Sequence, residues 1–131
     1  MKIPSATLRV NLTLGCRETP SDDAFFDALD AAGADAVVRA FPRRLDTVLT
    51  ESVRNFSAGE RLRFALAREL LRGTRVLLLD EATARLDADN ETRFLETVLR
   101  AFRDRTVLMI RHTPHPLTDG FPILRIGSSQ A

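Results

Sequence analysis

Two short apolar runs, each ending in ionisable side chains, constrain the fold of this chain most strongly. They are RVLLLDE at residues 75–81 and RTVLMIRH at residues 105–112. Each contains four consecutive apolar residues, a pattern typical of strands that are buried on both faces of a parallel sheet. We therefore expect two buried parallel strands at these positions.

A helix is expected ahead of the first run, from about Ala58 to Leu71. Leu62, Leu66 and Leu70 recur there at helical spacing, and Gly73 ends the pattern. A leucine stripe of this kind is the apolar face of an amphipathic helix.

A second amphipathic helix is expected between the two runs, with Asp87 or Asp89 as its N-cap. The apolar side of this helix comprises Phe94, Leu95, Val98, Leu99 and Phe102. The order helix, strand, helix, strand is the signature of a parallel α/β layer. FPILRI at residues 121–126 is expected to add a third strand.

Short helices are expected in the first half of the chain. One begins at Ser21 or Asp22 and stops at Gly33, and the next covers residues 34–40. Loop or extended chain is expected from residue 41 to residue 55.

Composition favours a soluble globular protein of one domain. The chain has 131 residues, of which 44% are hydrophobic and 28% charged. The net charge of +1 gives no field that would favour nucleic acid as the main partner. Cys16 is the only cysteine, which excludes an internal disulfide and favours a reducing compartment. No run approaches the ~20 apolar residues that span a bilayer.

Ionisable side chains follow both predicted strands. Asp80 and Glu81 end the first run, and His112 ends the second. Because ligands of open parallel sheets bind beyond the carboxyl ends of the strands, neighbouring strands would bring these three together on one rim. Two carboxylates and an imidazole suit metal-assisted hydrolysis. The alternative is that charged residues follow the strands simply because the chain leaves the core there.

The segment NFSAGER begins the first long helix with unusually small side chains. Ser57 and Glu60 fit a capping box, which does not explain Ala58 and Gly59 between them. Glycine in a first turn costs up to about 1 kcal/mol relative to alanine. Small side chains leave the backbone N–H groups exposed at the positive end of the helix dipole. The pattern therefore indicates close approach by an anion such as phosphate.

These residues in this order resemble the C-terminal half of the ATP-binding cassette of ABC transporters. Ser57, Ala58, Gly59 and Glu60 stand where that family has its Ser-Gly-Gly-Gln signature. The resemblance implies that they contact the γ-phosphate of ATP held by a partner cassette, in a head-to-tail dimer.

The same resemblance implies roles for the rim. Asp80 matches the Walker B aspartate that supports Mg²⁺ through water, and Glu81 matches the catalytic glutamate. Residues 84–87 match the D-loop, whose aspartate, Asp87, couples the two ATP sites. His112 matches the switch histidine that contacts the γ-phosphate.

The resemblance extends over about residues 5 to 126. It implies a division into residues 1–56, a portion of the helical subdomain of exporter-type cassettes, and residues 57–131, the signature helix and Walker B/H-loop part. ESVRN, residues 51–55, is a loose version of the loop that contacts the transmembrane domain of an exporter. Departures from the family pattern are Phe56, Ala58, Glu60 and Arg111, the last in place of a small hydroxyl residue.

A complete cassette also has a Gly-x-x-x-x-Gly-Lys-Ser/Thr loop, Walker A, that cradles phosphates. This sequence lacks it, since its only lysine is Lys2 and no glycine precedes that position. The resemblance thus implies a partial P-loop NTPase fold of the α/β class, without Walker A or Q-loop, and negligible ATP hydrolysis by the chain alone. The strand ending at His112 would lose a neighbour and present an open apolar edge.

The leading functional expectation is a C-terminal portion of an exporter ATPase, at the cytoplasmic face of the membrane through a transmembrane partner. The alternative is a non-catalytic module that docks on an intact cassette and supplies the signature in trans. A fragment of a chromosome-maintenance or DNA-repair ATPase shares the motifs, but those proteins carry coiled-coil insertions and this chain shows no sustained heptads.

Overall fold

A computed structural model describes residues 6–50 and 55–125 of the chain as a mixed α/β structure. The helices and strands are α1 Leu8–Leu12, α2 Asp22–Ala31, α3 Asp35–Arg39, α4 Ala58–Leu71, β1 Val76–Asp80, α5 Ala88–Ala101 and β2 Thr106–Ile110. Two short 3₁₀ turns, η1 Arg44–Asp46 and η2 Pro116–Thr118, complete the regular structure of the described ranges.

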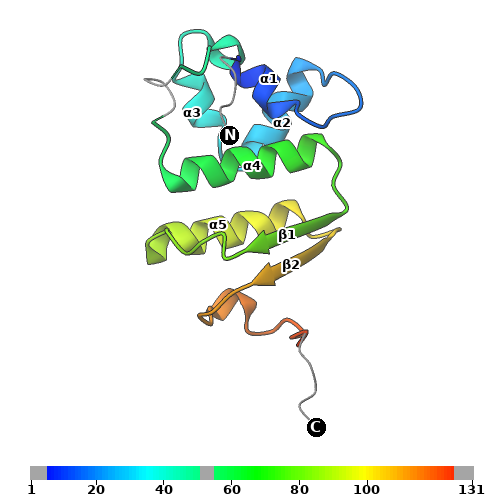
Figure 1. Cartoon of the computed structure of the whole chain (residues 1–131), viewed down its shortest axis with the longest axis vertical. Coiled ribbons are helices and arrows are strands. Elements are labelled where there is room, and N and C mark those ends of the chain that lie inside the picture. The colour runs from blue at the N-terminus through cyan, green and yellow to red at the C-terminus, as the bar shows by residue number, and fades with distance from the viewer. Residues whose placement is uncertain (1–5, 51–54, 126–131) are drawn as a thin grey trace.

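The two predicted strands are confirmed and lie side by side. β1 and β2 pair in parallel, with Val76 opposite Thr106 and Asp80 opposite Ile110. α5 forms the crossover between them, as parallel pairing requires. The carboxyl ends of both strands therefore meet at one edge of the sheet (Figure 1).

Local signals at its two ends define α4. The Ser57 hydroxyl accepts a hydrogen bond from the backbone N–H of Glu60, and the Glu60 carboxylate accepts one from the backbone N–H of Ser57. This is the expected capping box. At the other end Gly73 takes a φ of +68°, which glycine adopts without steric cost, and the helix stops as predicted.

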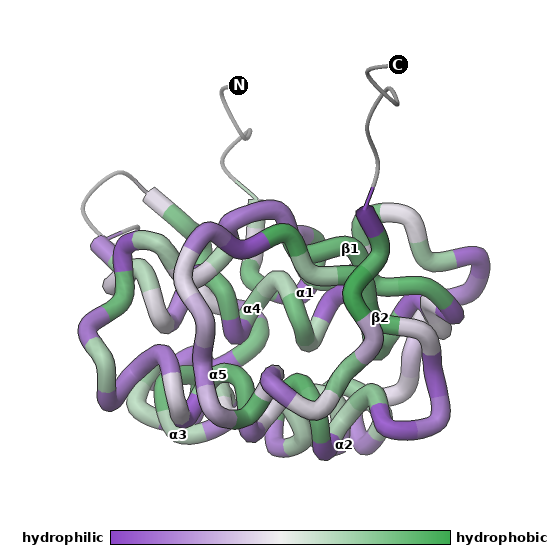
Figure 2. The backbone as a smooth tube through the Cα atoms, turned by 90° about the horizontal axis from the view of Figure 1, so that it is seen from below, coloured by the Kyte–Doolittle hydropathy of each residue, from purple (hydrophilic) through white to green (hydrophobic). Residues whose placement is uncertain are grey.

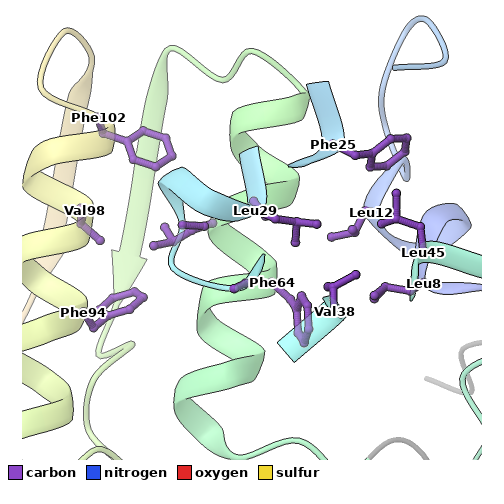
Figure 3. Close-up of a cluster of buried hydrophobic side chains, with 14 of the residues drawn as sticks. Leu8, Leu12, Phe25, Leu29, Val38, Leu45, Phe64, Phe94, Val98 and Phe102 are labelled. Atoms are coloured by element: carbon purple, nitrogen blue, oxygen red, sulfur yellow. The ribbon is translucent and has the colours of Figure 1, made fainter. Parts of the chain in front are cut away.

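α4 lies between two layers (Figure 1). The helices α1, α2 and α3 lie on one side of it, and β1 and α5 lie on the other. Figure 3 shows the same arrangement in side chains, with Phe94 and Val98 of α5 on one side of α4 and Leu12 and Leu29 on the other. The buried residues form one continuous core through the molecule.

The helical part agrees with the expected short helices. Ser21 caps α2, and Gly33, with a φ of +72°, follows its end. The loop expected after α3 contains η1 and a bridge between Thr7 and Val48. α1 is a five-residue helix that no residue pattern predicted individually, because so short a helix shows no periodicity.

The expectation that the strands are buried on both faces is wrong in this structure. Leu77 of β1 is 5% exposed, whereas Leu78 is 62% exposed. On β2, Leu108 and Ile110 are 45% and 46% exposed. Both strands are strongly apolar in Figure 2, but α4 and α5 cover only one face of the two-stranded sheet. We call Val76, Leu78, Leu108 and Ile110 the open sheet face.

The predicted third strand is not present in the described part of residues 121–126. Residues 121–125 are exposed and form no strand, and residue 126 lies outside the described ranges. Residues 51–54, which are most of the ESVRN segment expected to contact a transmembrane domain, also lie outside them. None of the helices in the described ranges is both long and apolar enough to cross a membrane.

One-sided burial predicts opposite outcomes for two adjacent leucines. Leu77→Ala should lower the free energy of unfolding by about 2–5 kcal/mol, since it leaves a cavity in the core. Leu78→Ala should change it by only about 0.5 kcal/mol or less, as at an exposed position. Urea unfolding of both variants measures this. Equal losses would mean that the open sheet face is covered in solution.

Candidate functional site

The rim predicted from the two strands is formed by their register. Asp80 is the last residue of β1, and Glu81 follows it and donates its backbone N–H to the carbonyl of Ile110 at 2.9 Å. His112 lies two residues beyond that carbonyl. Its Nε2 forms a hydrogen bond with Oε1 of Glu81. The structure thus brings Glu81 and His112 into direct contact.

Glu81 has an unusual backbone conformation. Its φ is +47°, in the left-handed region that side chains other than glycine rarely adopt. Such a conformation costs about 1–3 kcal/mol and persists only where the surroundings enforce it. Here the hydrogen bond to Ile110 holds the backbone, so that the carboxylate turns toward His112.

The contact between Glu81 and His112 is open to solvent. Their side chains are 47% and 75% exposed. Exposed ion pairs contribute about 0–1 kcal/mol to stability, so this pair is a minor contribution to the fold. The accessible carboxylate can accept a proton from water, and an imidazole N–H beside it can donate a hydrogen bond to an anion.

Asp80 offers a second carboxylate on the rim. It is exposed, and within the described ranges its side chain makes no hydrogen bond or ion pair. Nor do those ranges contain a group of three acidic, histidine or cysteine side chains able to hold a metal ion by themselves. Mg²⁺ is commonly bound by one or two carboxylates together with water and substrate phosphates. The chemistry of Asp80 fits such a ligand.

The start of α4 is only partly exposed to solvent. Ser57 is exposed and Ala58 half-buried, whereas Gly59 is buried. A Cβ built on Gly59 would lie 3.7 Å from Cδ2 of Leu86, in the turn that follows β1. The backbone N–H groups of Ala58 and Gly59 have no acceptor among the described residues. Two donors thus remain at the positive end of the helix.

Asp87 is the N-cap of α5. Its carboxylate accepts hydrogen bonds from the backbone N–H of Asn90 at 2.9 Å and from the Asn90 side chain at 2.8 Å. These bonds, the backbone one first, lower the pKa of Asp87 below the ordinary aspartate value. Asp87 is therefore a carboxylate at neutral pH, and of the two predicted caps, Asp87 and Asp89, the structure selects Asp87.

Figure 1 shows how these parts are arranged. The start of α4, the carboxyl ends of β1 and β2 and the start of α5 all lie on the same side of the molecule. α4 and α5 run opposite to the strands that follow them, which brings both helix starts to the side of the rim. The predicted site residues thus gather at one end of the fold.

Sequence reasoning missed three residues beside the rim. Thr83, Glu91 and Arg111 form a hydrogen-bonded cluster just behind Glu81 and His112. Arg111 was noted only as a departure from a family pattern. Glu91 and Arg111 are 20 residues apart in the sequence, so no local sequence pattern predicts that they form an ion pair.

Comparison with known proteins gives matches over most of the chain. The family model described as "ABC transporter" matches residues 4–84. ATP-binding cassette sub-family C member 8 of Homo sapiens is 41% identical over 113 residues, which cover 86% of this chain and 7% of the relative. A multidrug resistance ABC transporter ATP-binding and permease protein of Lactococcus lactis is 35% identical over 128 residues, which cover 98% of this chain and 22% of the relative.

A third relative matches a shorter stretch. ATP-binding cassette sub-family B member 10, mitochondrial, of Mus musculus is 45% identical over 85 residues, which cover 65% of this chain and 12% of the relative. The chain therefore spans less than a quarter of the length of each of these relatives.

The capping box gives a stability prediction at the start of α4. Ser57→Ala should lower the free energy of unfolding by about 1 kcal/mol, because the N–H of Glu60 loses its acceptor. Gly59→Ala should raise it by up to about 1 kcal/mol, since the new methyl group meets Arg63 and Leu86 at ordinary contact distances of 3.6 and 3.7 Å. Urea unfolding compares them. A destabilised Gly59→Ala variant would show that the fold itself requires glycine.

Asp87 gives a pH prediction. Its pKa is lower in the folded chain, so its stabilising effect is complete above the unfolded pKa and is lost as pH falls through the folded pKa. Asp87→Asn retains an amide cap but removes the charge. We expect the wild type to exceed this variant in stability at neutral pH, and the difference to vanish in acid. A difference independent of pH, measured by urea unfolding between neutral and acidic pH, would contradict the charge effect.

Proposed function

The chain belongs to the ABC transporter family, and we propose that it forms the C-terminal portion of an exporter-type ATP-binding cassette. The parent activity is ATP hydrolysis coupled to transport across a membrane. The observation that carries this proposal is the contact between Glu81 and His112 at the ends of two adjacent parallel strands. Family membership and the similarity to ATP-binding and permease proteins support it.

Glu81 is the proposed catalytic base. It would accept a proton from the water that attacks the terminal phosphorus of ATP, while the bond to the bridging oxygen breaks and ADP leaves. In its imidazolium form, which carries a proton on each ring nitrogen, His112 would donate one hydrogen bond to the transferring phosphoryl group and another to the Glu81 carboxylate, which it holds in orientation. Asp80 would hold Mg²⁺, which supplies positive charge that neutralises the phosphate oxygens.

Residues 57–60 are the proposed signature. Ser57 and the backbone N–H groups of Ala58 and Gly59 would meet the γ-phosphate of an ATP molecule on a second cassette, in a head-to-tail dimer. Glu60 is occupied by the capping box and is a structural member of this group. Asp87, at the neighbouring helix start, would couple the two ATP sites.

Two further assignments belong to this proposal. Residues 1–56 form a portion of the helical subdomain, and residues 57–131 form the Walker B part of the cassette. Through a transmembrane partner domain the assembly would lie at the cytoplasmic face of a membrane. Similarity to a relative that is named as an ATP-binding and permease protein supports such a partner.

The 131 residues alone are not proposed to hydrolyse ATP. Their single lysine, Lys2, does not stand in a phosphate-binding loop, and catalysis of phosphoryl transfer consists mainly of positioning. A non-catalytic module that supplies its signature in trans is the second candidate. It is favoured by the complete capping box, which builds the start of α4 from local bonds.

Complementation distinguishes the two candidates. The chain is mixed with the phosphate-loop half of a related cassette, and ATP turnover is measured with Mg²⁺. We expect turnover with the wild type and a decrease of about 10²–10⁴-fold for Glu81→Gln, because the general base is lost. Glu96→Gln is the matched control, since it removes the same charge from an exposed position of α5.

A second arm uses an intact cassette whose own signature serine is replaced. Restored turnover that requires Ser57 of this chain but is unchanged by Glu81→Gln would favour the non-catalytic module. If ATP turnover with the phosphate-loop half is unchanged by Glu81→Gln, the proposed catalytic role of Glu81 is contradicted.

A further inference from the structure

The cluster of Thr83, Glu91 and Arg111 centres on one carboxylate oxygen. Oε1 of Glu91 accepts the Thr83 hydroxyl at 2.7 Å and Nη2 of Arg111 at 2.8 Å. Nη1 of Arg111 donates to Oγ1 of Thr83 at 3.1 Å. The three side chains therefore close a triangle of hydrogen bonds, which we call the buried tie.

The buried tie is mostly, but not fully, shielded from water. The side chains of Arg111 and Glu91 are 14% and 20% exposed, and Thr83 is 9% exposed. The Thr83 hydroxyl, and after it Arg111, lower the pKa of Glu91 below the ordinary glutamate value, so the acid is charged at neutral pH. Removing one member leaves a buried group without its partner, which is costly.

The buried tie joins the two chain segments that carry the rim to the start of α5. Thr83 lies two residues after Glu81, in the turn beyond β1. Arg111 immediately precedes His112, and Glu91 lies one helical turn after the N-cap of α5. The planar guanidinium satisfies both partners in only one orientation. The tie therefore fixes the position of the end of β2 relative to the turn beyond β1.

A second contact anchors the other side of His112. Nδ1 of His115 accepts the backbone N–H of Leu117 at 3.2 Å, which puts the imidazole proton on Nε2. That nitrogen lies 3.1 Å from Oγ1 of Thr92, whose hydroxyl in turn donates to the carbonyl of Ala88. Side-chain hydrogen bonds thus connect the chain to the first turns of α5 both before His112, through Arg111, and after it, through His115.

We propose that Arg111, Glu91 and Thr83 are positioning residues that hold His112 against Glu81. The Glu81–His112 contact is exposed and weak by itself, so its geometry has to come from the backbone on either side. A partly buried ion pair adds little net stability over well-packed apolar residues, so the proposed role of this one is to restrict how the two chain segments are arranged. The proposal rests on the proposed function of Glu81 and His112 and extends it to groups that do not touch substrate.

The imidazole signals of the full chain test this proposal without ATP. The chain has two histidines, so its side-chain ¹⁵N spectrum contains two imidazole sets. Glu81→Gln identifies the His112 set by its shift. We expect Glu91→Gln and Arg111→Met to move the His112 signals in the same direction as Glu81→Gln, because the ring separates from Glu81. Glu96→Gln should leave them in place.

Folding is monitored on the same samples through the backbone amide signals of α4. A folded Glu91→Gln or Arg111→Met variant with His112 signals like those of the wild type would overturn the proposal. Should Arg111→Met not fold, Thr83→Val removes two of the three hydrogen bonds of the triangle with little change of shape, and it must shift the His112 signals for the proposal to stand.

Turnover in the complementation assay gives the second readout. Glu91→Gln and Arg111→Met should lower kcat on the order of tenfold to a hundredfold, with the KM for ATP unchanged, because misplacement of a catalytic group affects the chemical step. A raised KM with unchanged kcat would overturn the positioning role. Absence of turnover in the wild type would contradict the proposed function, whereas the imidazole signals would still decide the role of the tie.

Discussion

Burial of α4 on two sides is the constraint on which the rest of the structure depends. The helix packs against α1 and α2 on one side and lies over β1 and α5 on the other, so one apolar core continues past it. Each fully buried leucine or phenylalanine in such a core contributes about 1.5–3 kcal/mol. Close packing leaves the helix few other orientations. The first turn of α4 is consequently held beside the turn that follows β1, where Leu86 faces Gly59.

Stability and the proposed chemistry are carried by different side chains in this molecule. Glu81 and His112 are exposed, and their contact can contribute only weakly to folding. Behind them Glu91 and Arg111 are largely buried and form bonds that are costly to break. Between the two groups runs the strained backbone of Glu81, fixed by the carbonyl of Ile110. Accessible side chains on a rigid support are what the proposed hydrolytic site requires.

Features set by local signals were predictable from the sequence. Ser57 and Asp87 cap their helices. The two apolar runs that end in Asp80 and in Arg111–His112 correctly indicated parallel strands, and the structure adds that these strands are neighbours. Features that depend on what covers a surface were not predictable. An apolar run shows that a strand is hydrophobic, but it does not show whether helices cover one face of the sheet or both. Burial of both faces was therefore wrongly expected. The third strand was wrongly expected for the same reason, since its apolar run does not show what it would pack against. The buried tie depends on side-chain directions across 20 residues, which no periodicity records.

Contacts that cover the open sheet face and its edges would affect both the stability of the fold and the proposed site. Four apolar side chains are exposed there, and the free edges of a two-stranded sheet expose unpaired backbone groups. A polypeptide that paired with β2 would satisfy these groups beside the strand end that leads to His112. Binding to the folded chain but not to the unfolded chain raises stability by mass action. A segment that brought a phosphate-binding loop to Glu81 and His112 would therefore stabilise the fold by the same contacts that complete its chemistry.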